Sequence, residues 1–207
     1  MANTQSPFGL VQWGTVNGAS PNFAGMNYPP FRISPGYSTA IGFGDLVTLV
    51  AGSGPTGYCI QWANGSGSAT YQVAGVFYGC TYQSLSQRKQ VWNNYWPGSD
   101  ANGDVQAFVC SDPNAIFMIQ ANSGPINQSM IGMTCDVAVG SVNTTTGWSG
   151  MSLSNPSTSS PATLPLKIVS LVTAPPGVNG TDQTTAYNNV LVTFNNQIFK
   201  SLLTIHS

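Results

Sequence analysis

The chain has 207 residues, of which 42% are hydrophobic but only 5% are charged, and its formal net charge is −1. Soluble domains usually carry about 25% charged residues, so neutral polar side chains take their place here. Five Lys and Arg residues cannot form the basic stripe of a nucleic-acid-binding surface. The composition also disfavours a helical bundle and a membrane-spanning helix. Because a net charge this small opposes self-association only weakly, we expect the protein to be part of an assembly.

Residues 1–40 are predicted to form an extended N-terminal arm. The first residues lack the basic and apolar regions of a secretory signal, so we expect synthesis in a cytoplasm. Five prolines and little alternation of polar and apolar residues disfavour regular strands here. An apolar but irregular arm is expected to lie on a surface that it does not itself supply. Its predicted anchors are Phe8, Trp13, Phe23, Tyr28 and Phe31.

Residues 41–140 are predicted to form an all-β body, either a β-barrel or a jelly-roll-like β-sandwich. Runs rich in β-branched and aromatic residues alternate with Gly, Pro and Asn-Gly turns, as is typical of these folds. The predicted strands, including two beyond the body, cover residues 45–50, 58–63, 71–78, 105–110, 115–120, 130–139, 166–172 and 190–194.

The segment Gly52–Gly57 matches the G-x-G-x-x-G pattern of dinucleotide-binding loops. That function needs a helix directly after the loop, because the helix N-terminus holds the pyrophosphate. The residues that follow, 58–62, have a strand pattern instead. A hairpin loop is therefore the preferred interpretation.

The C-terminal part is predicted to hold a linker and a small β unit. Residues 141–165 are rich in Ser, Thr, Asn and Pro, which is typical of a long loop or an exposed linker. Residues 166–207 are expected to supply strands that complete the body or are appended to it.

Four cysteines, Cys59, Cys80, Cys110 and Cys135, are widely spaced and accompany a single His. Structural zinc needs clustered ligands, so this spacing disfavours a zinc site. Most of these cysteines lie in apolar strand-like runs, where we expect buried free thiols. One or two disulfides remain an alternative if the protein matures outside the cell.

The acidic residues offer weak candidates for metal binding and catalysis. Asp100, Asn102 and Asp104 have the spacing of the first three ligands of a calcium loop, but the rest of that loop is absent. Asp100 and Asp104 are also the only close carboxylate pair that a glycan hydrolase could use. His206 lies next to the last residue, where chain ends usually fray. We therefore expect no enzymatic activity and no cofactor.

An aromatic cluster is predicted at Trp92, Tyr95 and Trp96. Such residues can form a stacking platform for carbohydrate, or they can lie in a core or a subunit interface. Tyr and Trp are enriched at protein interfaces because they bury a large area and keep one polar contact. The interface or core interpretation is preferred.

Several short motifs carry a family resemblance through their order and spacing. They are Pro7–Leu10, Gly44–Val47, Gly75–Tyr82, Asn94–Gly98 and Val109–Gln120. Together they resemble the small structural proteins of tailed bacteriophages that decorate or cement the capsid. The resemblance covers roughly residues 7–120, and Val11–Gly14 stand where the family has basic residues.

This resemblance implies a β-barrel or sandwich module that binds outside the major capsid protein lattice as an oligomer. The expected partners are the major capsid protein and further copies of the chain, as a dimer or trimer, with no nucleic acid and no membrane. The expected location is the capsid surface of the virion. The alternative function is a carbohydrate-binding adhesin or receptor-binding module exposed on the virion.

Overall fold

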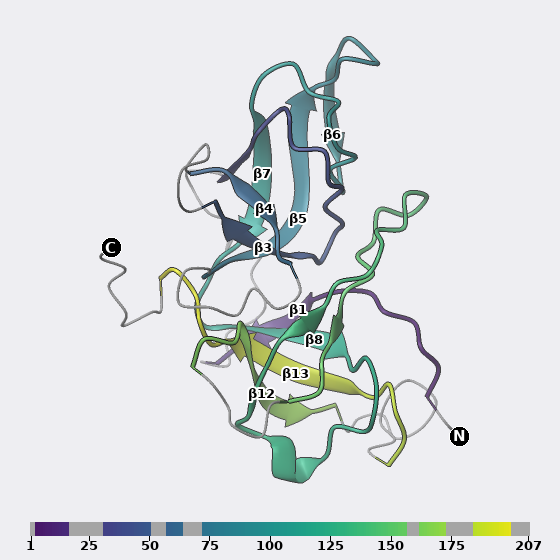
Figure 1. Ribbon diagram of the computed structural model, residues 1–207, viewed down its shortest axis with the longest axis vertical. Helices are drawn as coiled ribbons and strands as arrows, with labels where there is room; N and C mark the ends of the chain where they lie inside the picture. Colours follow the sequence, from purple (N-terminus) through teal and green to yellow (C-terminus); the bar gives the residue numbers. More distant parts are fainter. Residues whose placement is uncertain are drawn as a thin grey trace.

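The computed structural model describes residues 3–16, 31–50, 57–63, 72–156, 162–172 and 184–199 (Figure 1). The predicted all-β class is confirmed: antiparallel sheets pack together in a sandwich-like arrangement. In the part of the chain that is described, the only helical element is the short 3₁₀ turn η2 (Gln128–Met130). None of these residues forms a helix that is long and apolar enough to cross a membrane.

The lower sheet in Figure 1 has five strands in the order β1-β8-β13-β12-β9. Each neighbouring pair is antiparallel. This sheet combines the first strand of the chain, β1, with the last two, β12 and β13. The strands are β1 (Val11–Thr15), β8 (Ala115–Gln120), β13 (Asn189–Phe194), β12 (Leu166–Leu171) and β9 (Thr134–Cys135).

The upper sheet has six strands, in the order β2-β7-β5-β3-β4 with β6 paired to β5. A small ribbon, β10 (Val137–Ala138) with β11 (Ser152–Leu153), lies outside both large sheets. The strands of the upper sheet are β2 (Phe31–Ile33), β7 (Val105–Cys110), β5 (Val73–Gln83), β3 (Leu46–Leu49), β4 (Cys59–Gln61) and β6 (Gln90–Asn93).

The upper sheet is curled until its two edge strands meet. Arg32 of β2 and Tyr58, the residue before β4, form a single parallel bridge. Two exposed strand edges are thereby covered, although one bridge does not make a continuous closed barrel. The inside of the curl holds a hydrophobic cluster that includes Val47, Phe77 and Trp96. We call this cluster the upper core.

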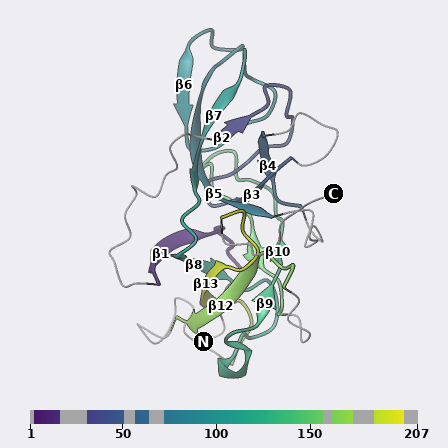
Figure 2. The same ribbon diagram turned by 90° about the vertical axis from the view of Figure 1, so that its left-hand side faces the viewer.

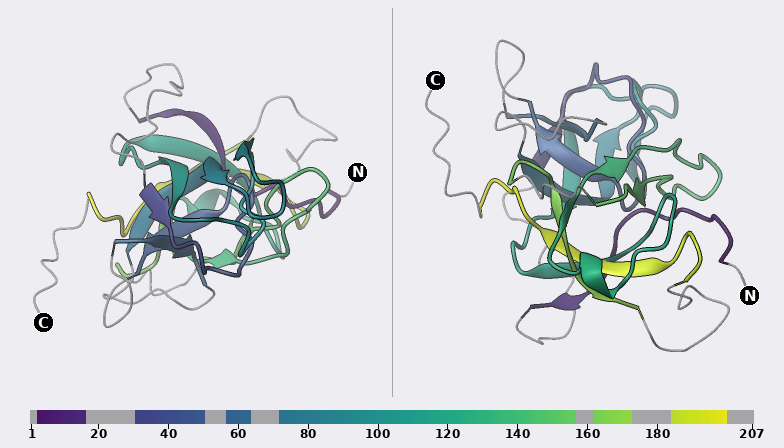
Figure 3. Two further views of the ribbon diagram at one scale, coloured as in Figure 1. Left: turned by 90° about the horizontal axis from the view of Figure 1, so that it is seen from above. Right: turned by 60° about the horizontal axis from the view of Figure 1, so that its bottom comes forward.

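A second hydrophobic cluster, the inter-sheet core, lies between the two sheets. Leu46 and Val76 of the upper sheet meet Phe117 and Phe194 of the lower sheet there, and the two phenyl rings are 5.0 Å apart. The long strands of the upper sheet run along the long axis of the molecule, whereas β8 and β13 run across it (Figures 1 and 3). Steeply crossed packing of this kind buries one face of each sheet.

Strand β5 is buried on both faces because it separates the two cores. Val76 and Tyr78 belong to the inter-sheet core, while Phe77 and Cys80 belong to the upper core. This dual burial explains why its sequence is a nearly continuous apolar run rather than an alternating one. The pairing of β5 with β7 shifts register between Phe77 and Gly79.

The N-terminal segment differs from the predicted arm. In the described parts of residues 1–40, β1 pairs with β8 and β2 pairs with β7 of the same chain. Gly9 and Leu10 also donate backbone hydrogen bonds, to the carbonyls of Met151 and Gly44. These parts therefore lie on a surface that the chain itself supplies, because remote strands offer them partners.

Candidate interaction surfaces

The predicted arm anchors have different environments. Trp13 is 50% exposed, whereas Phe8 is half-buried and Phe31 packs against the upper core. Phe23 and Tyr28 lie outside the described residues. Of the anchors that are described, Trp13 is therefore the one whose large side chain is available to another molecule.

The predicted aromatic cluster does not form one platform. Trp96 is fully buried in the upper core, where its ring meets Tyr82 edge-on at 5.2 Å and its indole N–H donates to the carbonyl of Tyr37 at 3.0 Å. Tyr95 is half-buried. Trp92 alone is widely exposed, at 66%. Trp96 thus belongs to the core, and Trp92 is the accessible member of the set.

Trp92 lies on the outer face of the upper sheet. Its neighbour Val91 packs against the upper core, so the alternation of β6 turns Trp92 outward. A Cβ atom at Gly79 of β5 would be 3.6 Å from the Cζ2 atom of the Trp92 indole and 2.9 Å from the carbonyl oxygen of Asn93. Gly79, at a φ of +137°, therefore leaves the space beside the indole open.

Strand register places a row of outward residues beside Trp92. Trp92 pairs with Thr81, Thr81 pairs with Gln106, and Gln106 pairs with Arg32. The row therefore crosses β6, β5, β7 and β2 without a break. It combines one large aromatic ring with hydroxyl, amide and guanidinium groups.

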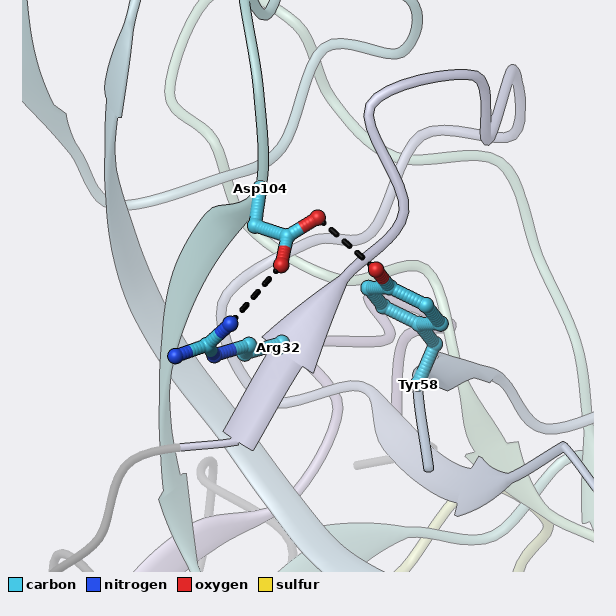
Figure 4. Close-up of polar contacts among 3 residues, drawn as sticks. All are labelled: Arg32, Tyr58 and Asp104. Atoms are coloured by element: carbon cyan, nitrogen blue, oxygen red, sulfur yellow. Dashed lines mark hydrogen bonds and ion pairs between the residues drawn. The ribbon is translucent and has the colours of Figure 1, made fainter. Parts of the chain in front are cut away.

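The far end of this row carries a polar network (Figure 4). Arg32 Nη1 lies 2.9 Å from Asp104 Oδ2, and the Tyr58 hydroxyl donates to Asp104 Oδ1 at 2.8 Å. The hydrogen bond to the Asp104 carboxylate raises the pKa of Tyr58. The network joins β2, β4 and the start of β7, where the two edges of the upper sheet meet. No local motif marks this network, because its members are far apart in the chain.

The two carboxylates of the calcium-like pattern have separate partners. Asp100 accepts hydrogen bonds from the Ser84 hydroxyl and from the backbone N–H and hydroxyl of Ser86, and the Ser84 hydrogen bond is the largest cause that lowers its pKa. Asp104 is turned to Arg32 and Tyr58 instead. Among the described residues, no group of three or more acidic, His or Cys side chains could hold a metal ion.

A hairpin from Val139 to Gly150 protrudes beside the upper sheet and is fixed to it by aromatic packing. The Trp148 ring lies 4.9 Å from the ring of Phe43, which lies 4.9 Å from the ring of Tyr78. Trp148 is 40% exposed. Through Phe43, the exposed Trp148 ring is thus connected to Tyr78 of the inter-sheet core.

A buried carboxylate secures the same hairpin. Asp45 accepts hydrogen bonds from the Gly42 N–H at 2.7 Å, from Gln61 Nε2 at 2.7 Å and from the Ser149 hydroxyl. Burial raises the pKa of Asp45 to about 6. Asp45 was not among the predicted site residues, because its sequence neighbours indicate only the start of a strand.

All four cysteines are buried and free, which agrees with the preferred interpretation of the sequence. Burial raises the pKa of Cys59, Cys80 and Cys135 to about 12 and that of Cys110 to about 11. Because the thiolate is the reactive form, these side chains act as small core residues.

Comparison with known proteins adds no assignment: no family model, no curated protein and no solved structure matches the chain.

Proposed function

We propose that the chain is a virion structural protein that binds the outside of a phage capsid lattice and stabilises it. The observation that carries this proposal is the exposure of Trp13 and Trp92, at 50% and 66%, on a chain with 5% charged residues. Exposed tryptophans are frequent anchors of protein interfaces, since one ring buries a large area at a small cost in conformational entropy. The resemblance to capsid decoration proteins supports the same partner.

The sparse charge suits a protein that works at high local concentration on a shell. In the described part of the chain, the one ion pair joins Arg32 to Asp104 within the molecule. Long-range steering by charge is therefore a small part of association, and apolar contact has to supply the affinity. A subunit that binds only the assembled lattice stabilises it by mass action, and attachment at several points multiplies the effect.

Trp13 and Trp92 lie on different sheets. Trp13 is on β1 of the lower sheet and Trp92 is on β6 of the upper sheet, and both strands lie toward the same side of the molecule in Figure 2. A contact surface on this side could use both rings against the major capsid protein or a second copy of the chain. Trp96 has no part in it, because it is buried.

The test is cosedimentation with expanded capsids that lack the protein, prepared from the phage that encodes it. We expect saturable binding by the wild-type chain and at least a tenfold loss of affinity for Trp13→Ala. Val169→Ala, at a 37% exposed site on β12, is the matched control and should bind as the wild type does. Absence of wild-type binding would refute the capsid proposal, and equal binding by Trp13→Ala would remove Trp13 from the contact surface.

A further inference from the structure

The bend that leads into β7 contains an Asn-Gly pair at Asn102 and Gly103. Both residues are exposed, and Gly103 has a φ of +91°. Apart from its chain neighbours, a Cβ atom at Gly103 would have no atom within 4 Å. In the part of the chain that the structure describes, no other Asn directly precedes a Gly. The peptide nitrogen that follows Asn102 is therefore open to water and is not crowded by a side chain of its own residue.

The side chain of Asn102 is free to turn toward that nitrogen. The backbone N–H of Asn102 donates to the carbonyl of Gln83 at 2.9 Å and anchors the bend. Among the described residues, however, no hydrogen bond involves the Asn102 side-chain amide or the Gly103 N–H. Neither group has to give up a contact before the two meet.

Two other exposed asparagines lack this combination. The Oδ1 atom of Asn143 accepts hydrogen bonds from the backbone N–H groups of Thr145 and Thr146, at 3.0 and 3.2 Å. The Oδ1 atom of Asn127 accepts hydrogen bonds from the N–H and the hydroxyl of Ser129, at 3.1 and 2.6 Å. The residues that follow these asparagines, a Thr and a Gln, also carry side chains beside the backbone nitrogen. Reactivity should therefore concentrate at Asn102.

From this geometry we propose that Asn102 is a site of spontaneous deamidation. The Gly103 nitrogen, after losing its proton to solvent, attacks Cγ of Asn102 and forms a new C–N bond. The Cγ–Nδ2 bond breaks, and the amide nitrogen takes up a proton and leaves as ammonia. Water then adds to either carbonyl of the five-membered imide and opens the ring. The product is aspartate or isoaspartate at position 102, which makes this Asn one of the chemically labile kind.

The modification lies beside the place where the two edges of the upper sheet meet, which we call the seam. Asp104 accepts the hydrogen bonds of Arg32 and Tyr58 there (Figure 4). Isoaspartate lengthens the backbone by one carbon between the anchor to Gln83 and Asp104. Either product also adds a negative charge two residues from Asp104. Deamidation is therefore expected to weaken the seam as the protein ages.

The experiment is incubation of the native full-length chain at pH 6 and pH 8, followed by peptide mapping in a mass spectrometer. A synthetic peptide with the sequence of residues 99–107 is incubated beside it. We expect Asn102 in the native chain to deamidate within about threefold of the peptide rate, because no local unfolding is needed to free the two groups. The reaction should be faster at pH 8, since the Gly103 nitrogen attacks after losing its proton.

Asn102→Gln is the matched control. It keeps an amide at this position, but its longer side chain would have to close a six-membered ring, so its peptide should gain no mass in the same time. The deamidated and intact forms of the wild type are then separated by anion exchange and melted. The deamidated form should have the lower melting temperature.

Two results would overturn the proposal. One is a rate at Asn102 that is at least tenfold lower in the native chain than in the peptide, which would show that the fold protects it. The other is a rate at Asn143 that equals the rate at Asn102 in the same sample. Equal melting temperatures of the two forms would contradict the effect on the seam. The incubation contains no capsid, so none of these results bears on capsid attachment.

Discussion

The hydroxyl of Ser149 donates a hydrogen bond to the buried carboxylate of Asp45, which lies 104 residues earlier in the chain. The same hydroxyl accepts a hydrogen bond from the N–H of Met151 at 2.9 Å. Ser149 therefore joins the protruding hairpin to the turn before β3 and satisfies two buried polar groups. Ser149 directly follows Trp148, whose ring packs at a tilt against that of Phe43.

The first prediction concerns the pH dependence of stability. Because burial raises the pKa of Asp45 from 3.8 to about 6, the folded state favours the protonated carboxyl. The contribution of Asp45 is therefore fully present below about pH 4 and is lost as the pH rises through about 6, by up to about 3 kcal/mol.

Urea unfolding of the wild type and Asp45→Asn from pH 4 to pH 8 measures this contribution. The isosteric amide can still accept hydrogen bonds from Gly42 and Gln61 and has no charge to lose. As the pH rises, the free energy of unfolding of the wild type should fall relative to that of Asp45→Asn. A difference that stays constant between pH 4 and pH 8 would contradict a buried, titrating Asp45.

The second prediction is that Ser149→Ala destabilises the fold by about 1–3 kcal/mol, because it leaves the Met151 N–H without its acceptor and Asp45 without one donor. Ser141→Ala is the matched control, since Ser141 is exposed in the same hairpin. Its unfolding free energy should stay within about 0.5 kcal/mol of the wild type. Equal midpoints in urea for the two variants would mean that the Ser149 contact adds nothing.

The third prediction separates two tryptophans that are four residues apart. Trp96→Ala should cost about 3–5 kcal/mol, because it opens a cavity in the upper core and removes the hydrogen bond to Tyr37. Trp92→Ala should change stability by less than about 0.5 kcal/mol. Thermal melting of both variants is the measurement, and a similar loss in each would contradict their opposite burial.

The contrast between these two residues shows where sequence reasoning reached its limit. The strong strand runs were predictable because their composition fixes them: β7 and β8 match the predicted ranges 105–110 and 115–120. Strands β1, β2 and β6 were missed, since they are short or polar and become strands through pairing with remote partners. Whether Trp92 or Trp96 points into the core or toward solvent depends on that pairing.

The candidate site was predictable only in part for the same reason. Exposed Trp92 and Trp13 were named from composition, but the row from Trp92 to Arg32 exists only through the register of four strands. Asp45 and Ser149 are brought together by the hairpin, and no local motif marks either of them. Long-range geometry therefore decided which of the candidates can act together.

The fourth prediction is that all four thiols are unreactive in the native state. Burial raises the pKa of every one of them, so the thiolate is scarce and the reagent has no access. A thiol-specific chromogenic reagent at pH 8 should label almost no cysteine within minutes in buffer and four equivalents in denaturant. Rapid labelling of one equivalent in buffer would show an accessible cysteine.

The central claim is that this protein stabilises a capsid lattice, and calorimetry of the shells tests it most directly. Expanded capsids that lack the protein are melted alone, with the purified wild-type chain, and with Trp13→Ala at the same concentration. The account predicts that the wild type raises the melting temperature of the shells in a saturable manner and that Trp13→Ala raises it less. An unchanged melting temperature at saturating wild-type protein would contradict the claim.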